Sequence, residues 1–181
     1  MTPYRAPWWL PGGHAQTLYA ALLPGASPPA RRERWETPDG DFLDLDWSGD
    51  ERAPRLLVLL HGLEGSSSSH YARAIVARAA ASGWRCVVPH FRGCSGEPNR
   101  LARGYHSGDS AELDWIFGRL GLLGKDLFAV GVSLGGNVLL KWLGERGAAA
   151  KLRRAAAVSA PLELAESARY STHTMRLAYC H

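Results

Sequence analysis

The sequence predicts an α/β fold with a mostly parallel sheet and helices on both of its faces. Short apolar runs of strand length alternate along the chain with helical stretches, which is the order of βαβ units. The runs at 55–62, 84–90 and 126–133 are apolar almost throughout, as expected of strands covered on both sides. The 181 residues, 46% of them hydrophobic, are enough for one domain with a sizeable core.

The elements begin with a hairpin. Residues 33–37 and 42–47 predict two strands around the turn signal Pro38-Asp39-Gly40. Polar and apolar residues alternate in the second strand, which favours a strand with one solvent-exposed face. After the apolar run at 55–62, an Ala-rich stretch at 71–81 predicts a helix that ends at a glycine.

The second half of the chain continues the alternation. Asp109 and Glu112 predict a capping box for a helix that runs to residue 120. A helix is expected over 134–145, and residues 155–161 predict one more strand. From residue 162 onward neither helical nor strand periodicity is visible. The chain therefore divides into an arm at 1–32, an α/β domain at 33–161 and an aberrant tail at 162–181.

The first 32 residues invite a membrane interpretation, because no charged side chain occurs over 6–30. Five prolines break that stretch too often for a spanning helix, so we expect no transmembrane segment. The apolar piece at 18–23 is too short for a secretory signal. We expect an irregular arm whose Trp8 and Trp9 pack on the domain.

Charge and cysteine content exclude several classes of function. The 21 basic and 17 acidic residues give a net charge of +4 and are scattered, so we expect no nucleic-acid partner. The three cysteines form no CxxC pair. This favours a reducing, cytoplasmic location and argues against both a disulfide framework and a bound metal.

The most informative stretch is Gly131-Val132-Ser133-Leu134-Gly135, which lies where a predicted strand passes into a predicted helix. A Gly-x-Ser-x-Gly turn at such a junction is a nucleophile elbow, in which the serine is held in a strained conformation with its hydroxyl exposed. Glycines on both sides of the turn prevent side-chain collisions. The sequence thus predicts Ser133 as a catalytic nucleophile.

A second motif supplies the expected oxyanion donors. His61-Gly62-Leu63 follows the carboxyl end of an earlier strand, and the backbone N–H groups of Leu63 and Leu134 are expected to form an oxyanion hole. We expect His61 and Gly62 to shape this loop, with His61 as a structural residue. A catalytic base at His61 is the weaker alternative.

Five stretches carry a resemblance to a known family: PDGDFLDLDWS, HGLEGSSSSHYAR, HFRGCSGEPNR, YHSGD and GVSLGGN. Together they resemble the YheT-like branch of the α/β-hydrolase superfamily, a group of predicted carboxylesterases and lipases. The resemblance spans about residues 35–160. It implies the α/β-hydrolase fold, a Ser133 nucleophile, short- to medium-chain acyl esters as small-molecule substrates, and no cofactor or metal. Arg92 and Gly93 in HFRGCSGEPNR are expected to shape a loop beside the site, although Arg92 could instead orient a substrate carbonyl.

The acid and histidine of the triad are the missing part. In this superfamily they follow the serine in chain order, but no aspartate occurs after Ser133. His173 and His181 lie in a tail that departs from the family pattern. We therefore expect a C-terminally truncated chain in which the acid and the histidine base are not present.

Three hypotheses follow from these observations. The first is a serine carboxylesterase of the α/β-hydrolase type, with this chain weakly active or inactive. The second is a non-catalytic remnant or a fold reused for binding. The third is an alcohol O-acyltransferase that uses the same acyl-enzyme.

Overall fold

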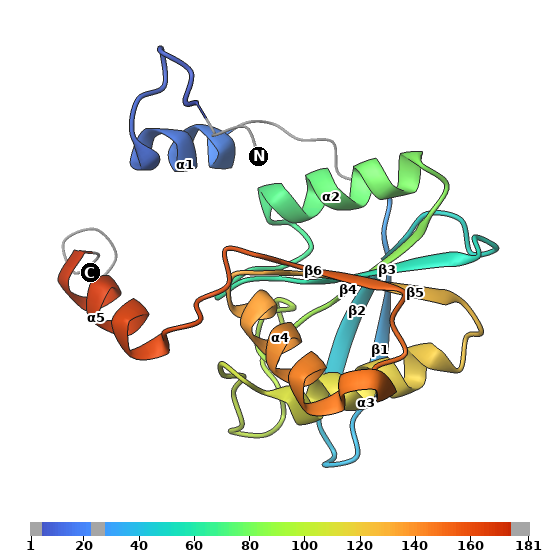
Figure 1. The fold of residues 1–181 in the computed structure, drawn as a ribbon. Helices are drawn as coiled ribbons and strands as arrows, with labels where there is room; N and C mark the ends of the chain where they lie inside the picture. Colours follow the sequence, from blue (N-terminus) through green and yellow to red (C-terminus); the bar gives the residue numbers. More distant parts are fainter. Residues whose placement is uncertain (1–4, 23–27, 175–181) are drawn as a thin grey trace.

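A computed structural model describes residues 5–22 and 28–174, and its centre is a six-stranded sheet (Figure 1). The strand order is β1-β2-β4-β3-β5-β6. The neighbouring pairs β4–β3, β3–β5 and β5–β6 are parallel, whereas β1–β2 and β2–β4 are antiparallel. The strands are β1 (Arg31–Glu36), β2 (Phe42–Ser48), β3 (Arg55–Leu60), β4 (Arg85–Pro89), β5 (Asp126–Val132) and β6 (Arg154–Val158). The predicted fold class is confirmed.

Helices cover both faces of the sheet, as Figure 1 shows. The helix α2 (His70–Ala81) lies on one face, and α3 (Ser110–Gly121) and α4 (Leu134–Arg146) lie together on the other. A short 3₁₀ turn, η1 (Gly147–Ala149), follows α4. The remaining helices, α1 (Gly13–Leu22) and α5 (Leu164–Thr174), stand away from the sheet in Figure 1.

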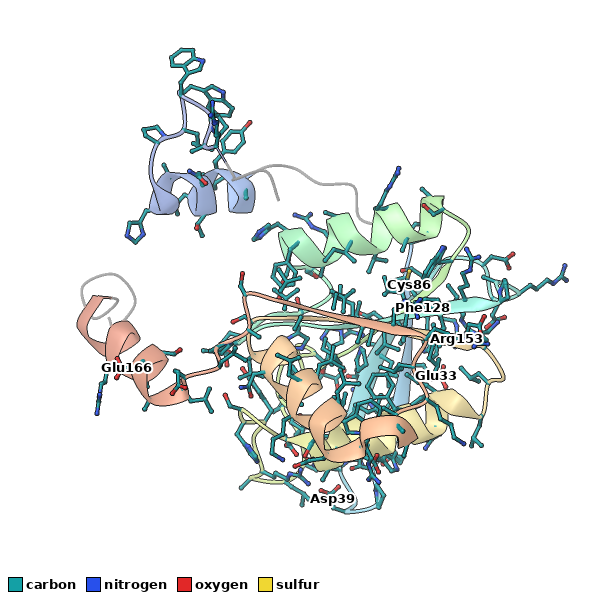
Figure 2. All side chains as sticks on the ribbon, in the orientation of Figure 1. Glu33, Asp39, Cys86, Phe128, Arg153 and Glu166 are labelled. Atoms are coloured by element: carbon teal, nitrogen blue, oxygen red, sulfur yellow. The ribbon has the colours of Figure 1, made fainter. Side chains whose placement is uncertain are left out.

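The core follows from the alternation of side chains along the strands. In β5, Leu127 and Ala129 face α3 and α4 and belong to the larger buried cluster. Phe128 and Val130 point to the α2 side, where Figure 2 shows Phe128 on the same side of the sheet as Cys86. The apolar runs of the sequence thus become strands with two buried faces.

The register of the parallel strands decides where the loops meet. Leu60, the last residue of β3, pairs with Gly131 near the end of β5. Because both strands run in the same direction, the loops that leave them emerge at the same edge of the sheet. The two motifs of interest, at residues 61–65 and 131–135, are brought together in this way.

The prediction of a solvent-exposed face on the second strand of the hairpin was wrong. All seven residues of β2 are buried, including Asp44 and Asp46. Arg34 donates two hydrogen bonds to Asp44, at 2.8 Å each, and Arg32 donates two to Asp46, at 2.7 and 2.9 Å. The arginines of β1 stand directly opposite these aspartates in the register, so paired charges take the place of solvent.

The predicted capping box also does not form. Asp109 is the N-cap residue of α3, but its side chain makes no capping hydrogen bond. It accepts hydrogen bonds from Arg103 at 3.1 and 3.2 Å, while Glu112 pairs with Arg92 at 2.7 Å. Both carboxylates are used by nearby arginines, whose charge attracts them more strongly than the backbone amides do.

The expectations for the two ends of the chain need correction as well. The arm contains α1, so it is not irregular throughout. Trp8 is 91% exposed and Trp9 packs edge-on against Tyr19 inside the arm, so these rings do not pack on the domain. The expected patternless tail contains α5. Residues 175–181 lie outside the described part of the chain.

Among the described residues, the outer strand β6 pairs with a neighbour on one side only, which leaves its other edge open. All five of its residues are exposed, and Val130 and Val132 beside it are only partly buried because α2 covers β3 and β4 instead. An open apolar edge is a template for pairing with another chain. We expect the 181-residue chain to self-associate at micromolar concentration, and we expect Ala156→Lys, at the centre of the edge, to reduce this association. Sedimentation velocity of both proteins measures the effect, and a monomeric unsubstituted chain would contradict it.

Candidate active site

Ser133 occupies a single-residue junction between β5, which ends at Val132, and α4, which begins at Leu134. Its backbone has φ 52° and ψ −117°, in a region that L-residues other than glycine rarely adopt. The Ser133 N–H donates to the Val158 carbonyl at 2.8 Å, which ties the junction to β6. A strained serine at the carboxyl end of an interior strand is the geometry that its motif predicts.

Close backbone contacts explain the glycines on either side of Ser133. A Cβ on Gly135 would lie 2.5 Å from the carbonyl oxygens of Leu60 and His61, and a Cβ on Gly131 would overlap the Gly135 carbonyl. The start of α4 therefore rests directly on the end of β3. Gly62 also lies close to the serine, since its Cβ would stand 3.2 Å from the Cβ of Ser133.

The hydrogen bonds of the His61 side chain are all with backbone groups. Its side chain is fully buried, and Nε2 accepts the N–H of Phe91 at 3.0 Å. The proton must then be on Nδ1, which donates to the Gly62 carbonyl at 2.8 Å. Burial lowers the pKa of His61 to about 4, so the ring is neutral near pH 7. This arrangement favours the loop-shaping role of His61 over a catalytic base.

The two expected oxyanion donors are available. Leu134 is the first residue of α4, so its N–H has no acceptor within the helix. Across the residues that the structure describes, neither the N–H of Leu134 nor that of Leu63 donates a hydrogen bond. Leu63 follows Gly62, which lies against Ser133. Two unpaired amides thus come from the two segments that meet at the serine.

The Ser133 side chain is partly exposed and has no hydrogen-bonding partner among the backbone groups and side chains that the structure describes. No described histidine or carboxylate contacts its hydroxyl. The alternative base His173 lies in α5, where the structure does not describe its side chain, and His181 lies outside the described residues. The structure therefore brings Ser133 and the two loops together, and none of the side chains that it describes is a base beside them.

Arg92 is enclosed by carboxylates. Its guanidinium, 3% exposed, donates to Asp41 at 2.9 Å, to Asp39 at 3.0 Å and to Glu112 at 2.7 Å. The loop after β4 is thereby joined to the β1–β2 turn and to α3. A guanidinium with three carboxylate partners in the protein is held away from a substrate, so the geometry favours the loop-shaping role.

The same loop is closed by Asn99. Its side-chain oxygen accepts the N–H of Gly93, and its amide donates to Asp41 at 2.9 Å and to the Phe42 carbonyl at 2.7 Å. Burial alone would raise the pKa of Asp41, but the hydrogen bonds from Asn99, from two backbone N–H groups and from Arg92 lower it to about 2. Asp41 is therefore a buried carboxylate that stays charged.

Sequence reasoning missed a second buried cluster around Asp46. Besides Arg32, this carboxylate accepts a hydrogen bond from Ser67 at 2.5 Å and contacts His90 Nε2 at 2.8 Å. Burial raises the pKa of Asp46, but these partners outweigh burial and hold it well below its usual range. The arginines at alternate positions of the first strand, opposite two aspartates, were the signal that could have revealed the cluster.

Two tyrosines were also missed. The Tyr71 hydroxyl accepts the N–H of Gly62 at 2.8 Å, and the Tyr105 hydroxyl accepts the N–H of Glu64 at 2.9 Å. Tyr71 lies in α2, whereas Tyr105 lies in the loop before α3. No local pattern links either residue to the 61–65 loop, so sequence spacing alone does not identify them.

The described residues contain neither a metal-binding cluster nor a membrane-spanning helix. Among the side chains that the structure describes, no group of three from His, Cys, Asp or Glu is placed to hold a metal ion. None of the helices in that part of the chain has the length and apolar character needed to cross a bilayer. Cys86 and Cys94 are free thiols, and burial raises the pKa of each.

Comparison with known proteins agrees with this geometry. A family model described as the alpha/beta hydrolase fold matches residues 55–176. The chain is 47% identical to the putative esterase YheT of Escherichia coli (strain K12) over 141 residues, which are 73% of this chain and 40% of that protein. It is 31% identical to phospholipase ABHD3 of Homo sapiens over 162 residues, 83% of this chain and 40% of that protein.

A solved structure gives the same fold. The esterase Pf2001 of Pyrococcus furiosus matches with a TM-score of 0.61 at 20% identity, over 78% of this chain and 61% of that chain. The chain spans about two fifths of the length of the two curated relatives. The family model covers most of the chain, including both β3 and the Ser133 junction. The chain therefore belongs to the α/β-hydrolase fold family and, within it, to the YheT-like branch.

Proposed function

We propose that this chain carries the nucleophile and oxyanion hole of a serine carboxylesterase that acts on short- to medium-chain acyl esters. The observation that carries the proposal is the position of Ser133, in a strained junction beside the unpaired N–H groups of Leu63 and Leu134. The names of the curated relatives, a putative esterase and a phospholipase, support ester hydrolysis as the reaction class.

The chemistry proceeds through an acyl-enzyme. The Ser133 oxygen attacks the ester carbonyl carbon and loses its proton to a base, and the carbonyl oxygen becomes an oxyanion that the two N–H groups stabilise. The carbon–oxygen bond to the alcohol then breaks, and the alcohol leaves with a proton. Water attacks the acyl-enzyme in the same way and releases the carboxylic acid. One oxyanion donor contributes about 3–4 kcal/mol to the barrier reduction.

Low turnover is expected of the 181-residue chain. No base contacts Ser133 among the described residues, and removing triad residues lowers turnover about a million-fold in a serine protease. The oxyanion hole and binding still leave roughly 10³-fold acceleration over the uncatalysed reaction in that case. We therefore propose slow acylation of Ser133 as the measurable activity.

A fluorophosphonate probe tests the proposal. We expect the folded chain to form one adduct, at Ser133, roughly 10³-fold faster than the urea-unfolded chain. The adduct is expected to vanish in Ser133→Ala and to persist in Ser159→Ala, since Ser159 is an exposed serine with a similar backbone, φ 51°. Intact mass spectrometry measures the rate. Equal labelling of folded and unfolded chains would support a non-catalytic fold instead.

Alcohol competition separates hydrolysis from acyl transfer. With a p-nitrophenyl ester as acyl donor, a hydrolase releases the acid whether or not a medium-chain alcohol is present. An acyltransferase shifts its product to the new ester as the alcohol concentration rises.

A cytoplasmic location remains a prediction from the cysteine content.

A further inference from the structure

The loop from Gly62 to Gly65, called here the donor loop, is a tight turn of unusual backbone strain. The N–H of Gly65 donates to the carbonyl of Gly62 at 3.0 Å, which closes the turn. Within it Glu64 has φ 51°, in the left-handed region that favours glycine. Strained backbone persists only where its surroundings hold it, so partners for this loop are expected.

Two tyrosine hydroxyls hold alternate amides of the donor loop. Tyr71 accepts the N–H of Gly62 at 2.8 Å, and Tyr105 accepts the N–H of Glu64 at 2.9 Å. The N–H between them belongs to Leu63, and it has no acceptor among the residues that the structure describes. The two tyrosines thus accept the N–H groups on either side of Leu63, and within the donor loop only the Leu63 N–H remains available.

The direction of the Leu63 N–H is also determined. The Gly62 carbonyl accepts two hydrogen bonds, from His61 Nδ1 at 2.8 Å and from the Gly65 N–H. Because the peptide between Gly62 and Leu63 is planar and trans, its N–H points opposite to this carbonyl. Anything that holds the Gly62 carbonyl therefore also orients the Leu63 N–H.

The tyrosines are themselves anchored. The Tyr105 ring stacks on Phe91, with centroids 5.3 Å apart and planes 14° apart, and its hydroxyl donates to Glu64 Oε1 at 2.7 Å. Burial raises the pKa of Tyr105, so the hydroxyl keeps the proton that it donates. Tyr71 is fixed in α2, and its hydroxyl stands where a Cβ on Gly65 would come within 2.7 Å.

We propose that Tyr71 and Tyr105 are positioning residues that hold the Leu63 N–H toward the oxyanion formed at Ser133. This inference rests on the proposed function, because it gives the donor loop a role in that reaction. Each tyrosine acts through the backbone and not on the substrate. Loss of either hydroxyl is expected to free the donor loop and to weaken the oxyanion contact without removing the nucleophile.

Hydrogen exchange gives the first readout. In Tyr71→Phe and Tyr105→Phe we expect the amides of residues 62–65 to exchange at least tenfold faster than in the unsubstituted chain. Tyr19→Phe is the matched control, because its ring contacts Trp9 in the arm and not the donor loop. Unchanged exchange in both variants would overturn the inference, whatever the reactivity of Ser133.

Acylation of Ser133 gives the second readout, with p-nitrophenyl butyrate and its thiono analogue, in which sulfur replaces the carbonyl oxygen. Each tyrosine variant is expected to lose about tenfold with the oxygen ester and much less with the thiono ester, since sulfur accepts hydrogen bonds poorly. An equal loss with both esters would show a merely structural role and overturn the inference. If the unsubstituted chain forms no Ser133 acyl adduct, the proposed function fails and the positioning role falls with it.

Discussion

Gly135→Ala is expected to destabilise the chain by more than about 3 kcal/mol and to abolish acylation of Ser133. The added methyl group would stand 2.5 Å from two backbone carbonyl oxygens, those of Leu60 and His61. Backbone atoms at the end of a buried strand cannot move aside as a flexible side chain can. The start of α4 must therefore lift from β3, which displaces the Ser133 junction.

Gly144→Ala is the matched control for this substitution. Gly144 lies in the same helix, is exposed, and has no atom within 4 Å of the position of an added Cβ. Replacing it with alanine should stabilise the helix by about 0.5–1 kcal/mol, because glycine is the poorer helix former. Urea unfolding followed by circular dichroism measures both variants. A Gly135→Ala protein as stable as the unsubstituted chain would show that α4 can move away from β3 at little cost.

Arg92→Met is expected to cost about 3–5 kcal/mol of unfolding free energy at neutral pH. The substitution keeps much of the side-chain volume but leaves Asp41, with a side-chain exposure of 0%, and Glu112, at 6%, without their shared cation. Arg92→Lys should recover only part of the loss, because a single ammonium group cannot reach three carboxylates in the geometry of a guanidinium.

The pH dependence gives this prediction a sign. Burial is the main cause that raises the pKa of Glu112, and hydrogen bonds from Arg92 oppose it. A carboxyl whose folded pKa is raised stabilises the fold only at low pH, and that stability is lost as the pH rises through the folded pKa. Without Arg92, the pKa of Glu112 is raised further. The loss of unfolding free energy caused by Arg92→Met should therefore be smaller at pH 4 than at pH 7.

Arg103→Met is the control for the arginine network. Arg103 pairs with Asp109 at 3.1 Å; its own side chain is 43% exposed, whereas that of Asp109 is 6% exposed. An arginine that keeps contact with solvent contributes less than a buried one, so this variant should lose less stability than Arg92→Met at any pH. Thermal unfolding between pH 4 and pH 8 compares the two arginine variants. A deficit of the same size for both would mean that burial around Arg92 is not what makes its pairs matter.

Much of the fold could be predicted from the sequence because its signals are local. The strands β3, β4 and β5 are apolar on both faces, and each is bounded by turn residues that mark its ends. The hairpin turn and α2 follow from equally short patterns. Burial of β2 was not predictable in this way, because Asp44 and Asp46 become acceptable in the interior only through arginines on a neighbouring strand.

The candidate site divides in the same manner. Ser133 and its glycines were predictable, since the strand, the turn and the helix are consecutive in the chain. The contacts of Tyr105 with Glu64 join residues 41 positions apart, so they depend on how the whole loop after β4 folds. Arg92 was named from its motif, but the choice between loop shaping and substrate contact required the positions of three carboxylates.

The hydrogen bond from the Ser133 N–H to the Val158 carbonyl links the proposed nucleophile to the outermost strand, β6. Ser133 is thus held by a strand that, among the described residues, pairs with one neighbour only. A fluctuation that separates β6 from β5 would break this hydrogen bond. The labelling rate of Ser133 should therefore report whether β6 remains paired with β5.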